Sequence, residues 1–158
     1  MLRSGELAVP YLDAERRSDH RRAGAAATAA ADRAIEVGAW WPADAWAHRA
    51  LWHFEQADMT LGAVRAARRI GDIRVAGGDP ASARRYYAEA IDEGRDIGAE
   101  REEGLAALGM ARAELGLGSV ATARRLGQIA LELLDRAGGS PEELAGAREV
   151  IGQEKEVG

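Results

Sequence analysis

Hydrophobic residues recur along this chain at the three-to-four spacing of helices that bury one face, and polar residues fill the positions between them. The pattern stops at short glycine-containing stretches and resumes after each of them. Because glycine favours the end of a helix, and Asp, Ser or Pro the start of the next, these stretches are predicted to be turns. The chain is therefore expected to form a series of helical hairpins.

Three hairpins and one closing helix are predicted. The expected helices cover residues 11–37 and 43–57, 60–77 and 80–97, 100–116 and 119–137, and finally 141–154. The first range is unusually long, and a break is expected near Gly24. The segment Trp40-Trp41-Pro42 is expected to connect this range to the second helix.

Turn chemistry supports the later boundaries. Asp79 is placed to cap the helix that begins at Pro80, and Ser119 is placed to cap its counterpart in the next hairpin. Ser140 and Glu143 have the spacing of a capping box around a first-turn proline. The helix that follows carries its apolar residues on one side, so it is expected to close the end of the stack.

Residues of the same kind recur at an offset of 40. The repeated positions are Gly38, Gly78 and Gly118; Ala43, Ala83 and Ala123; Ala50, Ala90 and Ala130; and Leu51, Ile91 and Leu131. Alanine is so abundant that some of its matches arise by chance, whereas the glycine and branched positions are more informative. A fixed period of this length is typical of stacked helix-turn-helix repeats.

The middle unit has the most distinctive pattern of small and large residues. It combines Ile70-Gly71 in its first helix, Gly78-Asp79 at its turn, and Ala83, Tyr87 and Ala90 in its second helix. In this pattern, residues 60–97 resemble a tetratricopeptide repeat. Leu108-Gly109 repeats part of the pattern in the third unit, but Gly127 replaces the aromatic there, and Ala47 replaces it in the first unit.

The resemblance implies an all-α fold. It is expected to be a right-handed α-solenoid of about three repeats, covering residues 11–57, 60–97 and 100–137, with a capping helix at about 141–154. Residues 1–158 are expected to form a single domain. A different array of helical hairpins with about 40 residues per unit stays open as an alternative.

Proteins of this family bind an extended peptide or a partner's helix on the concave wall formed by the first helices of their repeats, and the resemblance implies the same here. The positions assigned to this wall are Arg65, Arg68, Arg69, Asp72, Val75, Leu105, Leu108 and Arg112. The arginines are expected to form a cationic strip for an acidic peptide, because guanidinium groups pair with carboxylates. The alternative is a solvated face whose arginines pair with acidic residues on neighbouring helices. The family's clamp for a C-terminal carboxylate is not expected, because the chain contains no Asn.

Aromatic residues are concentrated in the first unit. Every tryptophan of the chain and its one phenylalanine fall within a short segment: Trp40, Trp41, Trp46, Trp52 and Phe54. One interpretation is a contact surface for a partner or for a second copy of the chain, since tryptophan is favoured at the centres of interfaces. Another is that the rings pack against the alanine-rich first helix, and a third is a pocket for a small molecule.

Composition narrows the classes of function. A chain of 158 residues with 47% hydrophobic and 30% charged residues is sufficient for one globular core. The net charge of -5 argues against nucleic-acid binding, which needs an excess of basic residues. There is no cysteine, no secretory signal and no apolar run long enough for a membrane helix, so a cytoplasmic location without membrane contact is expected.

No arrangement of residues indicates catalysis. His48 and His53 are five residues apart, which places them on different faces of a helix, and His20 has no evident companion, so surface or half-buried histidines are expected. Glu102 and Glu103 are interpreted as surface charge. Because no metal-binding or phosphate-binding motif is present, no cofactor, metal or enzymatic activity is predicted.

Two functions therefore stand. The first is a scaffold or adaptor that binds a protein or peptide, with an acidic partner favoured by the arginines and a homodimer expected if the tryptophans are exposed. The second is an all-helical small-molecule-binding or enzymatic subunit with a Trp-rich pocket near residues 40–54.

Overall fold

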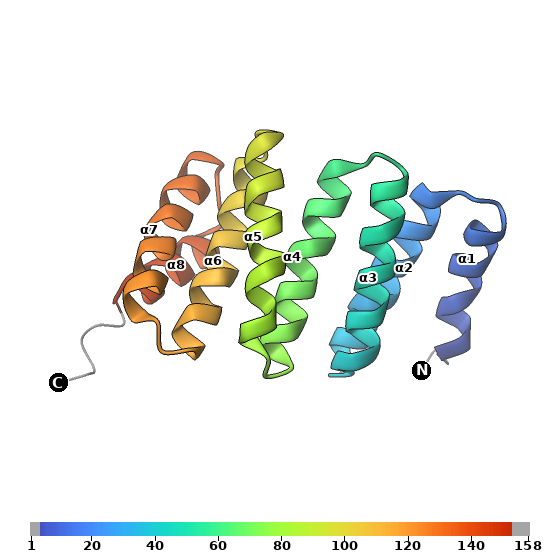
Figure 1. Ribbon diagram of the computed structural model, residues 1–158, viewed down its shortest axis with the longest axis horizontal. Coiled ribbons are helices and arrows are strands. Elements are labelled where there is room, and N and C mark those ends of the chain that lie inside the picture. The colour runs from blue at the N-terminus through green and yellow to red at the C-terminus, as the bar shows by residue number, and fades with distance from the viewer. Residues whose placement is uncertain (1–3, 153–158) are drawn as a thin grey trace.

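The structure is a computed structural model that describes residues 4–152, and all regular secondary structure in this range is helical. Helices α1 to α7 follow one another along the stack in chain order, and α8 lies beside α6 and α7 (Figure 1). Their bounds are α1 Ser4–Arg16, α2 His20–Glu36, α3 Trp40–Gln56, α4 Thr60–Ala76, α5 Pro80–Asp96, α6 Glu100–Gly116, α7 Val120–Arg136 and α8 Pro141–Gly152.

The helices form two layers. Each helix packs against its neighbours in the chain, and in addition α4 packs against α6 and α6 against α8. The even-numbered helices therefore share one layer, and the odd-numbered helices pack on it from the other side. The expected stack of helical hairpins is confirmed, with α2–α3, α4–α5 and α6–α7 as the three hairpins and α8 after them.

The turns recur every 20 residues. A residue with positive φ follows each of the first seven helices: Ser18, Gly38, Asp58, Gly78, Gly98, Gly118 and Gly138. The same pair of backbone bonds closes these turns, as where the amides of Gly78 and Asp79 donate to the carbonyls of Val75 and Arg74 at 3.1 and 2.8 Å. The offset of 40 in the sequence therefore corresponds to two helices of nearly equal length together with their turns.

The predicted bounds of the first helix were wrong. The chain breaks at Ser18, where α1 folds back onto α2, and not near Gly24. Gly24 lies inside α2, where a Cβ atom would come within 2.8 Å of the Phe54 ring. The predicted connection Trp40-Trp41-Pro42 is also wrong, because these residues form the first turn of α3, where proline needs no backbone hydrogen bond.

The predicted caps are confirmed at two of three positions. Asp79 accepts a hydrogen bond from the amide of Ser82 at 3.2 Å, and Ser140 and Glu143 exchange side-chain to backbone bonds of 2.8 and 3.2 Å. Ser119 precedes α7, but its side chain does not cap that helix and bonds to Glu114. The predicted end of α8 at 153–154 lies outside the described residues.

Aromatic rings fill spaces that glycines leave open. Tyr87 is 1% exposed and its ring lies between Gly71 of α4 and Gly109 of α6. A Cβ atom added to Gly71 would lie 2.7 Å from the Tyr87 ring, and one added to Gly109 would lie closer still. The absence of a side chain at Gly71 and Gly109 therefore leaves the space that the Tyr87 ring fills.

Candidate functional site

A groove with a volume of about 430 Å³ lies over α4, α6 and α8. Val75, Leu105 and Leu108 contribute its apolar wall, and Val75 and Leu105 remain half-exposed. Its other lining residues are Arg68, Asp72, Ala76, Tyr87, Gly109, Arg112, Glu142 and Glu143. The structure thus brings together six of the eight positions that the resemblance assigned to a concave wall.

Asp72 lies on the wall of this groove and is hydrogen-bonded from below. The hydroxyl of buried Tyr87 donates to its carboxylate at 2.6 Å, and Arg68 pairs with the other oxygen at 2.9 Å. Loss of solvation against the groove walls raises the pKa of the Asp72 carboxyl. The charge of Arg68 and the hydrogen bond from Tyr87 lower this pKa. Burial and the adjacent Asp72 charge raise the pKa of the Tyr87 hydroxyl, so it stays a hydrogen-bond donor at neutral pH.

Arg112 is the groove cation that forms no hydrogen bond or ion pair among the described residues, although its charge lowers the pKa of the Asp72 carboxyl across the groove. Its side chain is exposed. The guanidinium lies against Gly146 of α8, where an added Cβ would be 2.5 Å from Nη2. Glycine at this position therefore leaves the space that Arg112 occupies.

The other predicted arginines are engaged by acidic residues. Arg65 pairs with Glu102 at 2.8 Å and Arg69 pairs with Asp32 at 2.9 Å, and neither lines the groove. Both ion pairs join neighbouring helices of one layer, as expected for a solvated face with paired charges. The predicted cationic strip is thus largely neutralised, and Arg112 is its exception.

Glu102 and Glu103 were wrongly expected to be surface charges. They are 6% and 7% exposed, and Glu103 pairs with Arg95 at 3.0 Å. A third buried acid, Glu114, receives two bonds of 2.6 and 2.7 Å from Arg84, and this pairing lowers the pKa of the Glu114 carboxyl. Buried acids on α6 therefore bind this helix to α4 and α5, the two helices of the preceding hairpin.

The aromatic cluster is divided in the structure. The Trp46 ring packs edge-on against Tyr11 of α1 with centroids 5.1 Å apart, as the packing interpretation expects, and Phe54 packs on the core. Trp52 is half-exposed beside His20. Trp41 is 84% exposed. Trp46 and Trp52 are connected only indirectly, through the rings of Tyr11 and His53, among the ring contacts of the described residues.

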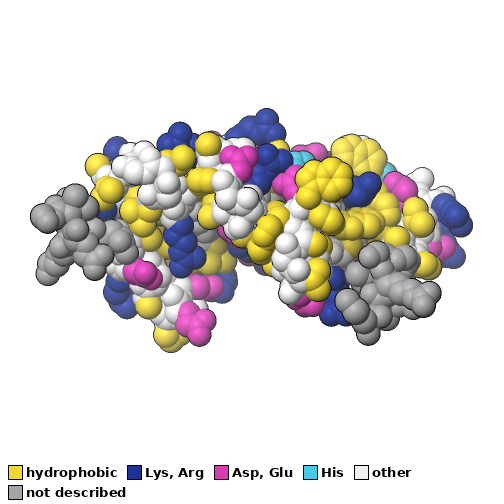
Figure 2. Space-filling model, turned by 90° about the horizontal axis from the view of Figure 1, so that it is seen from below, with side chains coloured by type: hydrophobic (Ala, Val, Ile, Leu, Met, Phe, Trp, Pro, Cys, Tyr) yellow, Lys and Arg dark blue, Asp and Glu magenta, His cyan; other side chains and the backbone are white. Residues whose placement is uncertain are grey.

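Trp41 lies on the edge formed by the turns at residues 37–39, 77–79 and 117–119. Figure 2 looks onto this edge, where hydrophobic side chains are exposed between charged ones. Val37 is 74% exposed beside Trp41, and Trp40 reaches the neighbouring turn at Gly77. This edge is an apolar surface separate from the groove.

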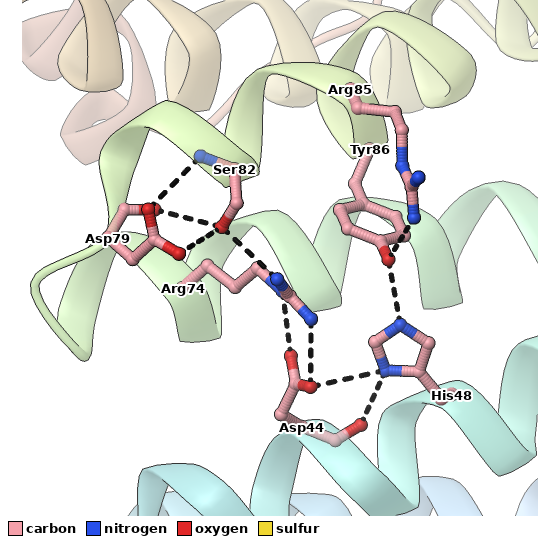
Figure 3. A network of polar contacts seen from close by, with 7 residues as sticks. All are labelled: Asp44, His48, Arg74, Asp79, Ser82, Arg85 and Tyr86. Atoms are coloured by element: carbon pink, nitrogen blue, oxygen red, sulfur yellow. Dashed lines mark hydrogen bonds and ion pairs between the residues drawn. The ribbon is translucent and has the colours of Figure 1, made fainter.

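A polar network links α3, α4 and α5 (Figure 3). Arg74 forms two bonds of 3.0 and 3.1 Å with Asp44 and a third of 3.1 Å with Ser82. His48 contacts the Asp44 carbonyl through Nδ1 at 2.8 Å and the Tyr86 hydroxyl through Nε2 at 2.9 Å. No sequence pattern predicted this network, because its members come from three helices and share no local motif. It holds α3 against α5 across α4.

A second chain of hydrogen bonds, also missed, joins α1, α2 and α3. The Tyr11 hydroxyl donates to Glu15 at 2.9 Å, and its oxygen lies 3.1 Å from Nε2 of His53. Nδ1 of His53 lies 3.0 Å from Nδ1 of His20. His53 is 2% exposed, so the expectation of surface or half-buried histidines is wrong for this residue. Within the described residues, no three acidic or histidine side chains gather as a metal ion requires, and no helix is long and apolar enough to span a bilayer.

Comparison with solved structures finds the same fold in the crystal structure of the apo form of RapI, with a TM-score of 0.75. The alignment has 12% sequence identity and covers 95% of this chain and 62% of that chain. The chain thus spans less than two thirds of the length of RapI. At this identity the likeness establishes the helical-repeat fold alone. No protein-family model matches the sequence, and no curated protein is significantly similar to it.

Proposed function

We propose that the chain is a binding module for proteins, and that its groove over α4, α6 and α8 holds a segment of the partner. An apolar side chain of that segment packs on Val75, Leu105 and Leu108. A carboxylate of the same segment pairs with Arg112. This assignment joins shape, an apolar wall and an available cation in one place.

The observation that carries this proposal is the contrast between Arg112 and the bonded charges Arg68, Asp72 and Glu143 of the groove; the exposed Glu142 is the other lining charge that forms no hydrogen bond or ion pair among the described residues. Asp72 is bonded by Tyr87 and Arg68, and Glu143 is bonded by Arg101 at 2.7 Å and by the amide of Ser140. Arg112 has hydrogen-bond donors to offer beside an apolar wall. A carboxylate is the ligand group that pairs with guanidinium through two parallel bonds.

The Trp-rich pocket is the weaker alternative. Trp46 and Trp52 contact different residues, and Trp41 is almost fully exposed. The apolar edge at Val37 and Trp41 is instead a second candidate surface for a protein partner or for a second copy of the chain.

Selection of peptides from a random displayed library tests the proposal. Wild-type protein is expected to select peptides that combine an apolar residue with Asp or Glu. The Arg112→Glu variant is expected to select peptides with Lys or Arg at the acidic position, because the groove charge is reversed. Affinities measured by calorimetry on both proteins quantify the exchange, and wild-type peptides are expected to bind the variant at least tenfold more weakly, a loss of about 1.4 kcal/mol.

Arg125→Glu on α7 is the matched control, because it makes the same change of charge at an exposed arginine outside the groove. This variant should select the same peptides as wild type. Peptides that bind all three proteins equally would contradict the role of the groove. Groove-dependent peptides without acidic residues would contradict only the role of Arg112.

A further inference from the structure

The groove has a negative charge that is as open to a ligand as the positive charge of Arg112. Glu142 of α8 lines the groove and is exposed, and it forms no hydrogen bond or ion pair among the described residues. The other two lining acids, Asp72 and Glu143, each accept bonds on both carboxylate oxygens. The carboxylate of Glu142 is therefore the acidic group that the groove offers to a ligand.

The first turn of α8 holds the backbone that carries Glu142. Pro141 begins this helix, and Ser140 and Glu143 on either side exchange side-chain to backbone bonds of 2.8 and 3.2 Å. Glu143 is bonded in addition to Arg101 of α6 at 2.7 Å. The positive end of the helix dipole favours an acid in this turn, but it does not occupy the oxygens of the carboxylate. Glu142 thus has a fixed backbone position and an uncommitted side chain.

The structure keeps Glu142 and Arg112 apart although both line the same groove. The Arg112 guanidinium lies against Gly146, and Gly146 follows Glu142 by one turn of α8, about 6 Å along the helix axis. Side chains of a helix lean towards its N-terminus, which adds to the distance between the carboxylate and the guanidinium. The two charges are thus neighbouring sites of opposite sign.

An acidic segment that pairs with Arg112 brings a second carboxylate close to Glu142. Exposed charges interact over about 8 Å at physiological ionic strength, so the two carboxylates repel each other. A basic residue of the same segment that pairs with Glu142 replaces this repulsion by attraction. Because an exposed ion pair adds little affinity, its main effect is on which segments bind.

We propose that the partner segment carries a basic residue for Glu142 as well as an acidic residue for Arg112. This inference rests on the proposed function of the groove. A separation of about 6 Å corresponds to residues two apart in an extended segment, or three to four apart on one face of a helix. The groove therefore selects segments with opposite charges two to four residues apart, and it disfavours segments in which both charges are negative.

Selection from a displayed random peptide library tests this inference with the variant Glu142→Lys. Wild-type protein is expected to select peptides with Lys or Arg two to four residues from Asp or Glu. The variant is expected to select a second acid in place of the basic residue, and to retain the acid that pairs with Arg112. Glu149→Lys is the matched control, because it makes the same change at an exposed acid of α8 outside the groove. It should select the same peptides as wild type.

Calorimetry on one selected peptide measures the ion pair by a double-mutant cycle. Replacing the basic residue of the peptide by Ala is expected to weaken binding to wild type about fivefold, as for an exposed ion pair. The same replacement should change the affinity for Glu142→Gln by less than about twofold. Binding of the parent peptide to Glu142→Gln should be about fivefold weaker but not lost, because Arg112 and the apolar wall still hold it.

Peptides that depend on Arg112 but lack a basic residue would overturn the inference and leave the proposed function in place. A basic residue that Glu142→Lys still selects would do the same. Tighter binding of the parent peptide to Glu142→Gln than to wild type would also overturn the inference, since it would mean that Glu142 competes with the peptide for Arg112. Equal binding of the peptides to wild type and Arg112→Glu would overturn the proposed function and this inference with it.

Discussion

At the scale of single residues, the fold depends on glycines that face aromatic rings across a helix boundary. Tyr87 lies between Gly71 and Gly109, and Phe54 lies between Gly24 and Gly62. In each case, a ring from the odd-numbered layer inserts between two helices of the even-numbered layer. Glycine in a helix interior costs about 0.5–1 kcal/mol relative to alanine, so these positions retain it for space.

Substitution at Gly109 tests this role. Gly109→Ala adds a methyl group where the Tyr87 ring lies, so the free energy of unfolding is expected to fall by about 1–3 kcal/mol. Gly116→Ala is the control, since its added Cβ would make an ordinary contact of 3.7 Å with Pro80. Urea unfolding should find this control equal to wild type or more stable by up to about 1 kcal/mol. Equal effects of the two substitutions would contradict the packing role of Gly109.

Sequence patterns predicted Tyr87 and its glycine neighbour, because they share one repeat and a recognisable spacing. They did not predict that Glu102 and Glu103 are buried, because acidic side chains are rarely buried without a partner and the partners lie on other helices. The contact between His20 and His53 was also missed. It joins α2 and α3 through residues 33 positions apart, which share no local motif.

At the scale of elements, each turn uses the same backbone geometry whatever residue occupies it. Five of the seven turns place glycine at positive φ, and Ser18 and Asp58 occupy the other two at φ 53°. The periodic glycines made the turns after α2, α4 and α6 predictable. Ser18 gives no such signal, which explains why the predicted first helix ran through the α1–α2 boundary.

Exchanging glycine and non-glycine residues at the turns measures the free-energy cost of a side chain at positive φ. Ser18→Gly relieves a left-handed conformation that disfavours a side chain, so it should raise the free energy of unfolding by about 0.5–1 kcal/mol. Gly98→Ala should lower it by about 1 kcal/mol, although the added methyl would meet no atom within 4 Å. Urea denaturation of both variants checks the prediction. A stabilised Gly98→Ala variant would show that the backbone conformation there is not constrained.

At the scale of the whole molecule, stacking converts an offset of 40 in the sequence into neighbouring walls of a groove. Asp72 and Arg112 occupy equivalent positions of α4 and α6, and α8 completes the site with Gly146 beneath Arg112. The resemblance predicted the residues that α4 and α6 contribute to the groove. The contribution of α8 could not be read from the sequence, because it depends on where the last helix crosses α6.

The whole molecule also offers a partner two separated surfaces, which are the groove and the apolar edge at Trp41. The groove combines an apolar wall with the Arg112 guanidinium, which forms no hydrogen bond or ion pair among the described residues, whereas the edge offers the exposed side chains of Val37 and Trp41. Glu142 of α8 lines the groove and Trp41 of α3 lies on the edge, so the location of a bound peptide can be measured by short-range cross-linking.

Photo-cross-linking of a selected peptide tests the central claim most directly. The chain has no cysteine, so a single Glu142→Cys in the groove or Trp41→Cys on the edge can each carry a benzophenone label. Binding over α4, α6 and α8 predicts that the peptide is cross-linked to the label at position 142 and not to that at 41. Cross-linking at 41 alone would contradict the groove as the binding site.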